Sequence, residues 1–248
     1  MFELHITAAS HVGCVRTNNE DMLYVNGQFI RDGEHATTIN TDEAGRSLIA
    51  LADGMGGHNS GEVASSDVLH NLQFFFDDMP EGLEPGSLYE TICDWLDSIN
   101  NIIDAKGKSD AQYFGMGTTL VALVYYQGDF FWMNCGDSRF YRMRNGQLQQ
   151  VSTDHSLSNL LGRSEHTNVI TNCIGGGCTT SYIDMVKYTA DVAVGDVFLL
   201  CSDGLSDMVP DATIERLLAE GADAHALCLA AEEAGGFDNV SAIVIHVK

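Results

Sequence analysis

The sequence is poor in basic residues and proline. Its 248 residues include three prolines, and its 12 lysines and arginines face 35 aspartates and glutamates, for a formal net charge of −23. Because so acidic a surface repels phosphate backbones and anionic lipids, we expect no nucleic-acid or membrane partner. The scarcity of proline and a hydrophobic content of 45% exclude a disordered chain.

Long apolar runs and a disulfide framework are also missing. No apolar run reaches the roughly 18 residues that suggest a membrane span, and residues 1–5 lack the basic and apolar regions of a signal peptide. The seven cysteines are odd in number and scattered, as is typical of free thiols in a reducing compartment. We therefore expect a cytoplasmic location.

Apolar residues at helical spacing predict two helices in the first half of the chain. The first spans residues 61–79. The second spans residues 87–107, with a capping box of Ser87 and Glu90 and a stop at Gly107. Its apolar stripe consists of Leu88, Ile92, Trp95, Leu96, Ile99, Ile102 and Ile103.

Short apolar runs and turn signals predict that strands dominate elsewhere. Asn145 and Gly146 form a strong hairpin signal between two such runs. Strands are predicted at 47–52, 118–126, 130–135, 139–144, 147–152, 182–189, 196–201 and 240–247, and helices near 211–220 and 223–234. Hairpins with central and late helices favour a single α+β domain over residues 1–248, its sheets covered by helices.

Several aspartates share one context, beside the end of an apolar strand and next to a glycine or another turn residue. They are Asp53, Asp137, Asp203 and Asp238. Side chains at the strand ends of a rigid sheet can gather at one edge, where ionised carboxylates repel each other unless a cation binds. Oxygen ligands suit Mg²⁺ or Mn²⁺ better than zinc. Each aspartate alone is more often a turn former, but the repeated context favours a metal centre.

Six short blocks follow one another along the chain. They are Arg16-Thr17-Asn18-Asn19-Glu20-Asp21, Asp53-Gly54-Met55-Gly56-Gly57-His58, Gly115-Met116-Gly117-Thr118-Thr119, Gly136-Asp137-Ser138-Arg139, Ser202-Asp203-Gly204-Leu205 and Asp238-Asn239. From about residue 8 to the end, the sequence resembles the metal-dependent serine/threonine protein phosphatases of the type 2C class, bacterial branch. The resemblance implies a four-layer α-β-β-α sandwich, with two antiparallel sheets flanked by helices and a metal centre at one edge.

The resemblance also implies a centre of two Mn²⁺ or Mg²⁺ ions. By position, Asp53 bridges both ions, Asp203 and Asp238 complete the first site, and the carbonyl of Gly54 holds the second. A glycine at position 54 lets the backbone carbonyl approach a metal that a bulkier residue would obstruct.

Further residues complete the implied centre. Asp21 and Glu20 act on the second ion through water, and Glu20 and Asn239 support the coordinating groups. Asp137 matches the aspartate of a third, weaker ion that it shares with Asp203.

Arg16 matches the arginine that grips the substrate phosphate, for which its planar fork is suited. Its alternative role is a structural salt bridge with Glu20 or Asp21. Two ions would supply the positive charge that this chain lacks, and a metal-bridging hydroxide would attack phosphorus in line.

A covalent nucleophile is not expected. Ser10, Ser138 and Ser202 have no convincing histidine or aspartate partners in the sequence, and no Cys-x5-Arg loop is present.

Two features depart from the family pattern. Met55 occupies the position at which many eukaryotic members carry a proposed general-acid histidine, and we do not transfer that role to His58. The Asn168-Val169-Ile170-Thr171 block begins only 14 residues after Asp154, so the flap that precedes it is shorter than in typical bacterial members.

We therefore expect a monomeric phosphatase that hydrolyses phosphoserine and phosphothreonine in proteins and opposes a bacterial Ser/Thr kinase. Two alternatives stay open. One is a catalytically silent signalling or binding module with the same fold, and the other is a regulator phosphatase acting on a phosphorylated anti-sigma antagonist. A haloacid-dehalogenase-type phosphatase is disfavoured, because Asp53-Gly54-Met55 does not supply an Asp-x-Asp nucleophile.

Overall fold

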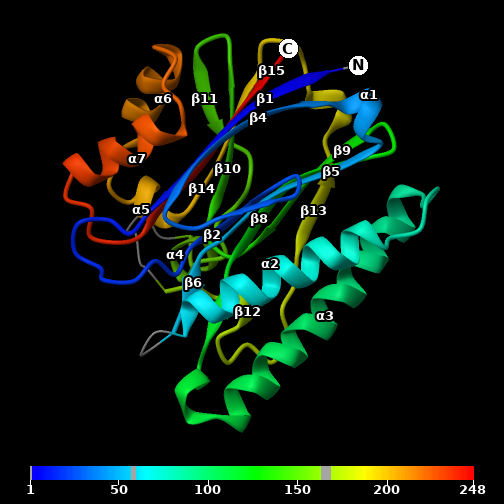
Figure 1. Ribbon diagram of the computed structural model, residues 1–248, viewed down its shortest axis with the longest axis vertical. Helices are drawn as coiled ribbons and strands as arrows, with labels where there is room; N and C mark the ends of the chain where they lie inside the picture. Colours follow the sequence, from blue (N-terminus) through cyan, green and yellow to red (C-terminus); the bar gives the residue numbers. More distant parts are fainter. Residues whose placement is uncertain (1, 57–59, 163–168) are drawn as a thin grey trace.

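Two six-stranded antiparallel sheets lie face to face, with helices on the outer side of each (Figure 1). The structure is a computed structural model that describes residues 2–56, 60–162 and 169–248. The first sheet has the order β11 (Gln147–Gln150), β10 (Arg139–Arg144), β14 (Val197–Cys201), β15 (Val240–Val247), β1 (Glu3–His11) and β4 (Gly33–Asn40). The second has the order β13 (Asp184–Lys187), β9 (Asp129–Cys135), β8 (Leu120–Tyr126), β5 (Arg46–Ala52), β2 (Met22–Val25) and β3 (Gln28–Ile30).

Helices form the outer layers, which confirms the four-layer arrangement expected from the sequence. The long helices α2 (Gly61–Asp77) and α3 (Pro85–Ser109) lie on one side, and α6 (Asp211–Ala219) and α7 (Ala224–Glu233) on the other (Figure 1). The remaining short helices are α1 (Thr41–Ala44), α4 (Leu157–Leu160), α5 (Asp203–Ser206) and the 3₁₀ helices η1 (Ala111–Tyr113) and η2 (Thr189–Asp191). A small sheet consists of β12 (Ile174–Gly175), β7 (Gly117–Thr118) and β6 (Gly54–Met55). None of the helices in the described part of the chain combines the length and apolarity that a membrane crossing requires.

Strand β5 shows why the central strands read as continuous apolar runs. Its residues from Ser47 to Ala52 are all buried. Leu48 and Ala50 belong to the core under α2 and α3, whereas Ile49 and Leu51 belong to the core between the sheets. A strand that is covered on both faces does not alternate between apolar and polar residues as a half-exposed strand does. Because β5 is packed on both sides, the residue that follows it is held in a fixed position.

Helix α3 begins earlier than predicted, and the expected capping box is absent. Pro85 is at the first helical position and Glu84 at the N-cap, while the carbonyl of Ser87 accepts a hydrogen bond from Thr91 inside the helix. Proline is favoured at this position because its φ is already helical and its missing N–H would have no partner there.

The other end of α3 also differs from the prediction. Gly107 does not stop the helix, which continues to Ser109. Gly107 is instead a site of close packing, where a Cβ atom would lie 3.0 Å from the carbonyl oxygen of Tyr113. Ile102 lies outside the buried stripe to which it was assigned, with 52% of its surface exposed.

Two isoleucines of α3 offer a matched test of this packing. Ile99 is 2% exposed and Ile102 is 52% exposed. We expect Ile99→Ala to lower the free energy of unfolding by about 2–5 kcal/mol through the lost contacts and the cavity left behind. Ile102→Ala should change it by less than about 0.5 kcal/mol. Urea unfolding followed by circular dichroism measures both, and equal losses would contradict the assigned faces.

Candidate metal centre

The predicted aspartates come together at one end of the two sheets. Asp53 follows β5, Asp137 follows β9, and Asp203 follows β14 at the start of α5. Asp238 precedes β15, and Asp21, which is 1% exposed, directly precedes β2. Because neighbouring strands are antiparallel, the ends of some and the beginnings of others meet at the same edge.

Electrostatic coupling shows how close these carboxyl groups are. Burial is the main cause that raises the pKa of Asp53 well above its ordinary value, and the charges of Asp21, Asp203, Asp137 and Asp238 raise it further. The carboxyl groups of Asp203 and Asp53 also share a hydrogen bond. A hydrogen bond between two carboxyl groups requires that one of them keeps its proton, which a bound divalent cation would displace.

The pKa values of the neighbouring carboxyl groups are also raised. Burial raises the pKa of Asp21 to about 7, against the lowering effect of hydrogen bonds from Ser241 and Ser202. Burial, followed by the charge of Asp203, raises the pKa of Asp137 to about 7. The pKa of Asp203 is raised to about 6 by burial and then by the charge of Asp238. The cluster is therefore short of positive charge.

Unused oxygen atoms make the cluster suitable for divalent cations. Within the described residues, the buried Oδ1 atoms of Asp21 and Asp137 accept no hydrogen bond. Buried acceptors without partners are rare because each costs free energy. Carboxylate oxygens are the ligand type that Mg²⁺ and Mn²⁺ prefer. The residues present therefore fit hard divalent ions.

The Gly115–Thr119 block positions Asp53. The Asp53 carbonyl accepts hydrogen bonds from Thr118 Oγ1 (2.8 Å) and from the Thr119 N–H (2.9 Å), and the Asp53 N–H donates to Thr119 Oγ1 (3.1 Å). These bonds divide the predicted strand 118–126 into β7 and β8. Thr119 Oγ1 also lies 2.7 Å from Ser138 Oγ, which connects Asp53 to the residue after Asp137.

Gly54 is required for packing, which differs from the reason inferred from the sequence. A Cβ atom at Gly54 would lie 2.2 Å from the carbonyl oxygen of Gly61 and 2.5 Å from that of Glu20. The Gly54 N–H donates to the same Glu20 carbonyl at 3.2 Å. The Glu20 carboxylate accepts a hydrogen bond from the N–H of Gly61, although burial still raises its pKa. Glu20 thus joins β6 to the beginning of α2.

Asn239 connects two segments of the centre that are far apart in sequence. Its Oδ1 accepts a hydrogen bond from the Glu20 N–H, and its Nδ2 donates to the carbonyls of Asn18 and Val12, each at 2.9 Å. The Asn239 N–H donates to Asp238 Oδ1 at 2.8 Å. Asn239 therefore fixes the Arg16-bearing segment next to Asp238.

Arg16 lies at the rim of the cluster. Its Nη2 donates to Asp238 Oδ2 at 2.8 Å, and the side chains of Arg16 and Asp238 are 51% and 40% exposed. The hydrogen bond to Asp238 raises the pKa of Arg16. The sequence-based alternative named Glu20 or Asp21 as the partner, and that assignment was wrong. A half-exposed guanidinium beside the carboxylates can still meet an anion from solvent.

The candidate serine nucleophiles are buried. The hydroxyl of Ser202 donates to Asp21 Oδ2 at 2.9 Å, so the expectation that it lacks an aspartate partner was wrong. Ser10, Ser138 and Ser202 are each 0% exposed, and in the described parts of the chain their hydrogen bonds do not reach a histidine. Because these hydroxyls are buried, none can reach a substrate.

Two positioning arginines were missed in the sequence. Arg139 Nε and Nη2 donate to the buried Asp154 carboxylate, at 3.0 and 2.7 Å to Oδ2. Arg31 Nη2 donates to the Glu62 carbonyl at 2.9 Å and its Nη1 to the Asn19 carbonyl at 3.2 Å. A charged residue gives no local sign in the sequence of which distant segment it binds.

The flap block returns close to Asp154. The N–H of Leu157 donates to the Val169 carbonyl at 2.9 Å, and Ser156 bridges Ile170. Asn168, with the rest of residues 163–168, lies outside the described residues, as do Gly57 and His58 of the second block.

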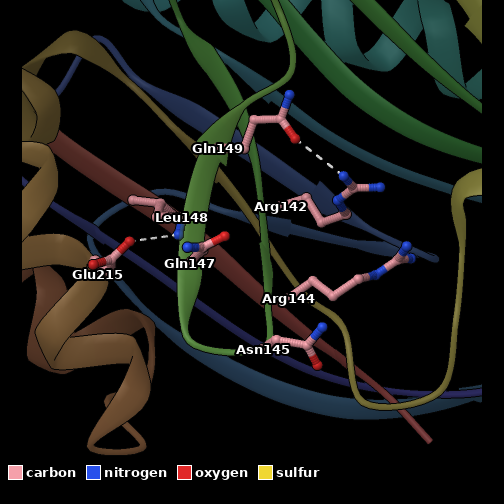
Figure 2. A pocket seen from close by; sticks show the side chains of 7 residues that line it. All are labelled: Arg142, Arg144, Asn145, Gln147, Leu148, Gln149 and Glu215. Carbon is pink, nitrogen blue, oxygen red and sulfur yellow. Dashed lines mark hydrogen bonds between the residues drawn. The ribbon is translucent and has the colours of Figure 1, made fainter.

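An open recess of about 570 Å³ lies elsewhere, on the β10–β11 hairpin (Figure 2). Its arginines are already occupied. Arg144 forms an ion pair with Asp196 at 2.6 Å, and Arg142 donates to Gln149 at 3.0 Å. The recess contains none of the aspartates of the centre.

Comparison with known sequences agrees with the geometry. A family model for protein phosphatase 2C matches residues 23–234. The serine/threonine protein phosphatase PstP of Mycobacterium tuberculosis is 35% identical over 254 residues, which covers 98% of this chain and 45% of PstP. This chain therefore spans less than half the length of PstP. The serine/threonine phosphatase stp of Listeria innocua is 29% identical, over 98% of this chain and 96% of that protein.

Solved structures have the same fold. The serine/threonine phosphatase of S. agalactiae superposes with a TM-score of 0.81 at 27% identity, covering 99% of this chain and 100% of that one. The catalytic domain of PstP, solved in complex with two manganese ions, gives a TM-score of 0.77 at 34% identity, covering 100% and 99%. With a family model that matches most of its length, this chain belongs to the protein phosphatase 2C family.

Proposed function

We propose that the protein is a divalent-metal-dependent phosphatase that hydrolyses phosphoserine and phosphothreonine in proteins. The observation that carries this proposal is the cluster of buried carboxyl groups with raised pKa values and unpartnered oxygens. Such a cluster is costly unless it binds cations. The names of the relatives, and the two manganese ions in PstP, support the same activity.

In this proposal Asp53 would hold both of two Mn²⁺ or Mg²⁺ ions. Asp203 and Asp238 would complete the first site, and the Gly54 carbonyl would hold the second. When bound, the ions supply positive charge to the phosphate and lower the pKa of a coordinated water.

The remaining residues of the centre act around this set. Asp21 and Glu20 reach the second ion through water, and Asn239 positions Glu20. Asp137 shares a third ion with Asp203.

The guanidinium of Arg16 would bind the phosphate of the substrate. Arg16 donates two hydrogen bonds to phosphate oxygens and orients the ester toward the aspartates. Met55, on β6 beside Asp53, has no proton to donate, so the leaving oxygen takes its proton from another group or from solvent. We further propose that the substrates are products of a bacterial Ser/Thr kinase.

Loss of a bridging carboxylate tests the centre directly. Asp53→Asn keeps the size of the side chain but removes its charge, and we expect hydrolysis of a phosphothreonine peptide with Mn²⁺ to fall about 100-fold or more. The matched control is Asp97→Asn, an exposed aspartate of α3, which should keep full activity. Near-normal turnover in a folded Asp53→Asn protein would exclude the centre. Absence of turnover in the metal-loaded wild type would instead favour the silent binding module.

Replacement of Arg16 should affect substrate binding more than turnover. With the phosphate clamp removed, Arg16→Ala should raise KM for a phosphopeptide about 10- to 100-fold at saturating Mn²⁺, while kcat changes far less. Arg142→Ala, which removes an arginine of the distant recess, serves as the control. An unchanged KM for Arg16→Ala would assign Arg16 a purely structural role with Asp238.

Metal binding should strengthen as the pH rises. The raised pKa values mean that ions must displace protons from Asp21, Asp137 and Asp203 near neutral pH. Unfolded carboxyl groups lose their protons near pH 4, whereas these native ones keep them longer. The stability of the metal-free chain therefore falls as the pH rises from about 4 to about 7.

The corresponding measurement is Tm with and without Mn²⁺, from about pH 5.5 to about pH 7.5. We expect the increase in Tm caused by Mn²⁺ to grow across this range. A constant increase would contradict the raised pKa values.

A further inference from the structure

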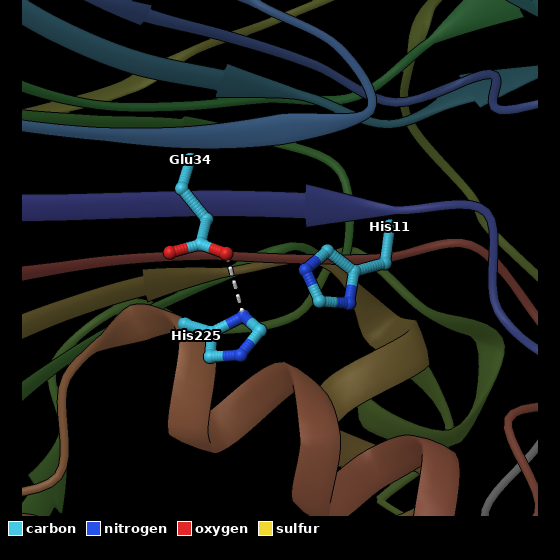
Figure 3. A group of neighbouring side chains, drawn as sticks. All are labelled: His11, Glu34 and His225. Carbon is cyan, nitrogen blue, oxygen red and sulfur yellow. Dashed lines mark ion pairs between the residues drawn. The ribbon is translucent and has the colours of Figure 1, made fainter.

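A second group of ligand-type side chains lies on the face of the first sheet that α7 covers. His11 ends β1, Glu34 is on the neighbouring strand β4, and His225 is in the first turn of α7 (Figure 3). One ligand atom from each of these three residues lies within 4.8 Å of the others. Among the described residues, these three form the group of potential metal ligands whose atoms lie this close together.

The fold holds the three residues in this arrangement. Glu34 is opposite Ala9 in the β1–β4 register, and His11 lies two residues beyond Ala9, on the same face of the sheet. Helix α7 is fixed to this face, because the N–H of Ala224 donates to Thr7 Oγ1 at 3.1 Å and Ala9 packs into the core beneath α7. The three side chains therefore project toward one point from two paired strands and the helix that packs on them.

One nitrogen of the group contacts a carboxylate without forming a hydrogen bond. His225 Nδ1 is 3.0 Å from Glu34 Oε1, yet this buried nitrogen makes no hydrogen bond within the described residues. His11 Nδ1 is 3.2 Å from Glu232 Oε1, and the two imidazole rings are 5.3 Å apart. Two imidazoles thus face two carboxylates in a strongly acidic protein.

We propose that His11, Glu34 and His225 form a Zn²⁺ site separate from the aspartate centre. Two imidazole nitrogens and one carboxylate oxygen are a ligand set of Zn²⁺ sites that leave the fourth position open. Tetrahedral ligands at 2.0–2.1 Å from zinc lie about 3.3 Å apart, so small rotations of these side chains close the present spacing.

Two neighbouring features suit the fourth position. Glu232 already contacts His11, and a recess of about 160 Å³ borders Glu34 and His225. This site has nitrogen and oxygen donors, whereas the aspartate centre has oxygen donors. The preferred metal therefore differs, because imidazole nitrogens suit Zn²⁺ and carboxylate oxygens suit harder ions. The two sites therefore bind different metals from one mixture.

The location connects this site to the rest of the molecule. His11 is five residues before Arg16, and Glu232 is six residues before Asp238. An ion here would fasten β1, β4 and α7 together where two of them lead into the aspartate centre. The binding of Zn²⁺ itself does not depend on the proposed phosphatase activity.

Calorimetric titration of the metal-free chain with Zn²⁺, at saturating Mg²⁺ to fill the aspartate centre, tests the proposal. We expect the wild type to bind one equivalent of Zn²⁺ that is lost, or weakened at least about 10-fold, in His225→Ala, His11→Ala and Glu34→Gln. His70→Ala, which removes an exposed histidine of α2, and Asp53→Asn should retain it. Zinc held by the Cys173 and Cys178 thiols, 3.3 Å apart, would persist in every histidine variant.

Thermal unfolding separates loss of binding from loss of structure. His225 is partly exposed, so the metal-free His225→Ala protein should unfold near the wild-type Tm. Zn²⁺ should raise the Tm of the wild type but not that of His225→Ala. Equal zinc stoichiometry and affinity in the wild type, His225→Ala and His11→Ala would overturn the proposal. So would loss of the zinc equivalent in Asp53→Asn alone, since that would place the ion in the aspartate centre.

Discussion

Repulsion among carboxyl groups at one end of the sheets is the constraint on which the rest of the centre depends. Asp21, Asp53, Asp137, Asp203 and Asp238 are held close enough to perturb one another. Strand ends can oppose that repulsion because hydrophobic cores lie both between the sheets and beneath the helices. Protons relieve part of the repulsion in the metal-free chain, and divalent cations would relieve the rest.

The side chains that position the aspartates are mostly neutral. Thr118 and Thr119 hold the backbone of Asp53, Ser202 donates to Asp21, and Asn239 fixes the segment beside Asp238. Neutral donors restrain the geometry without cancelling the negative charge, so the affinity for cations is preserved. A lysine or arginine in those positions would stabilise the metal-free cluster and compete with the ions.

The sequence predicted correctly the turns and strand ends that depend on neighbouring residues alone. The hairpin at Asn145 and Gly146 forms, with both residues at positive φ, and the aspartates occupy the predicted strand ends. Strands β1, β2, β3 and β4 were missed. Leu4, Ile6 and Ala8 alternate with polar residues in a short pattern, and β4 is an edge strand with little buried surface. The partner of Arg16 lies 222 residues away, so only the assembled fold determines it.

The acidity of the chain finally bears on how it would recognise phosphate. A protein of net charge −23 repels a phosphate dianion at long range, and Arg16 is already paired with Asp238. An ion held by Asp238 would compete with Arg16 for that carboxylate and so would free the guanidinium. The same ion weakens the repulsion that the dianion meets. Affinity for metal and affinity for phosphate should therefore rise together, because the metal would neutralise the aspartates that repel the phosphate.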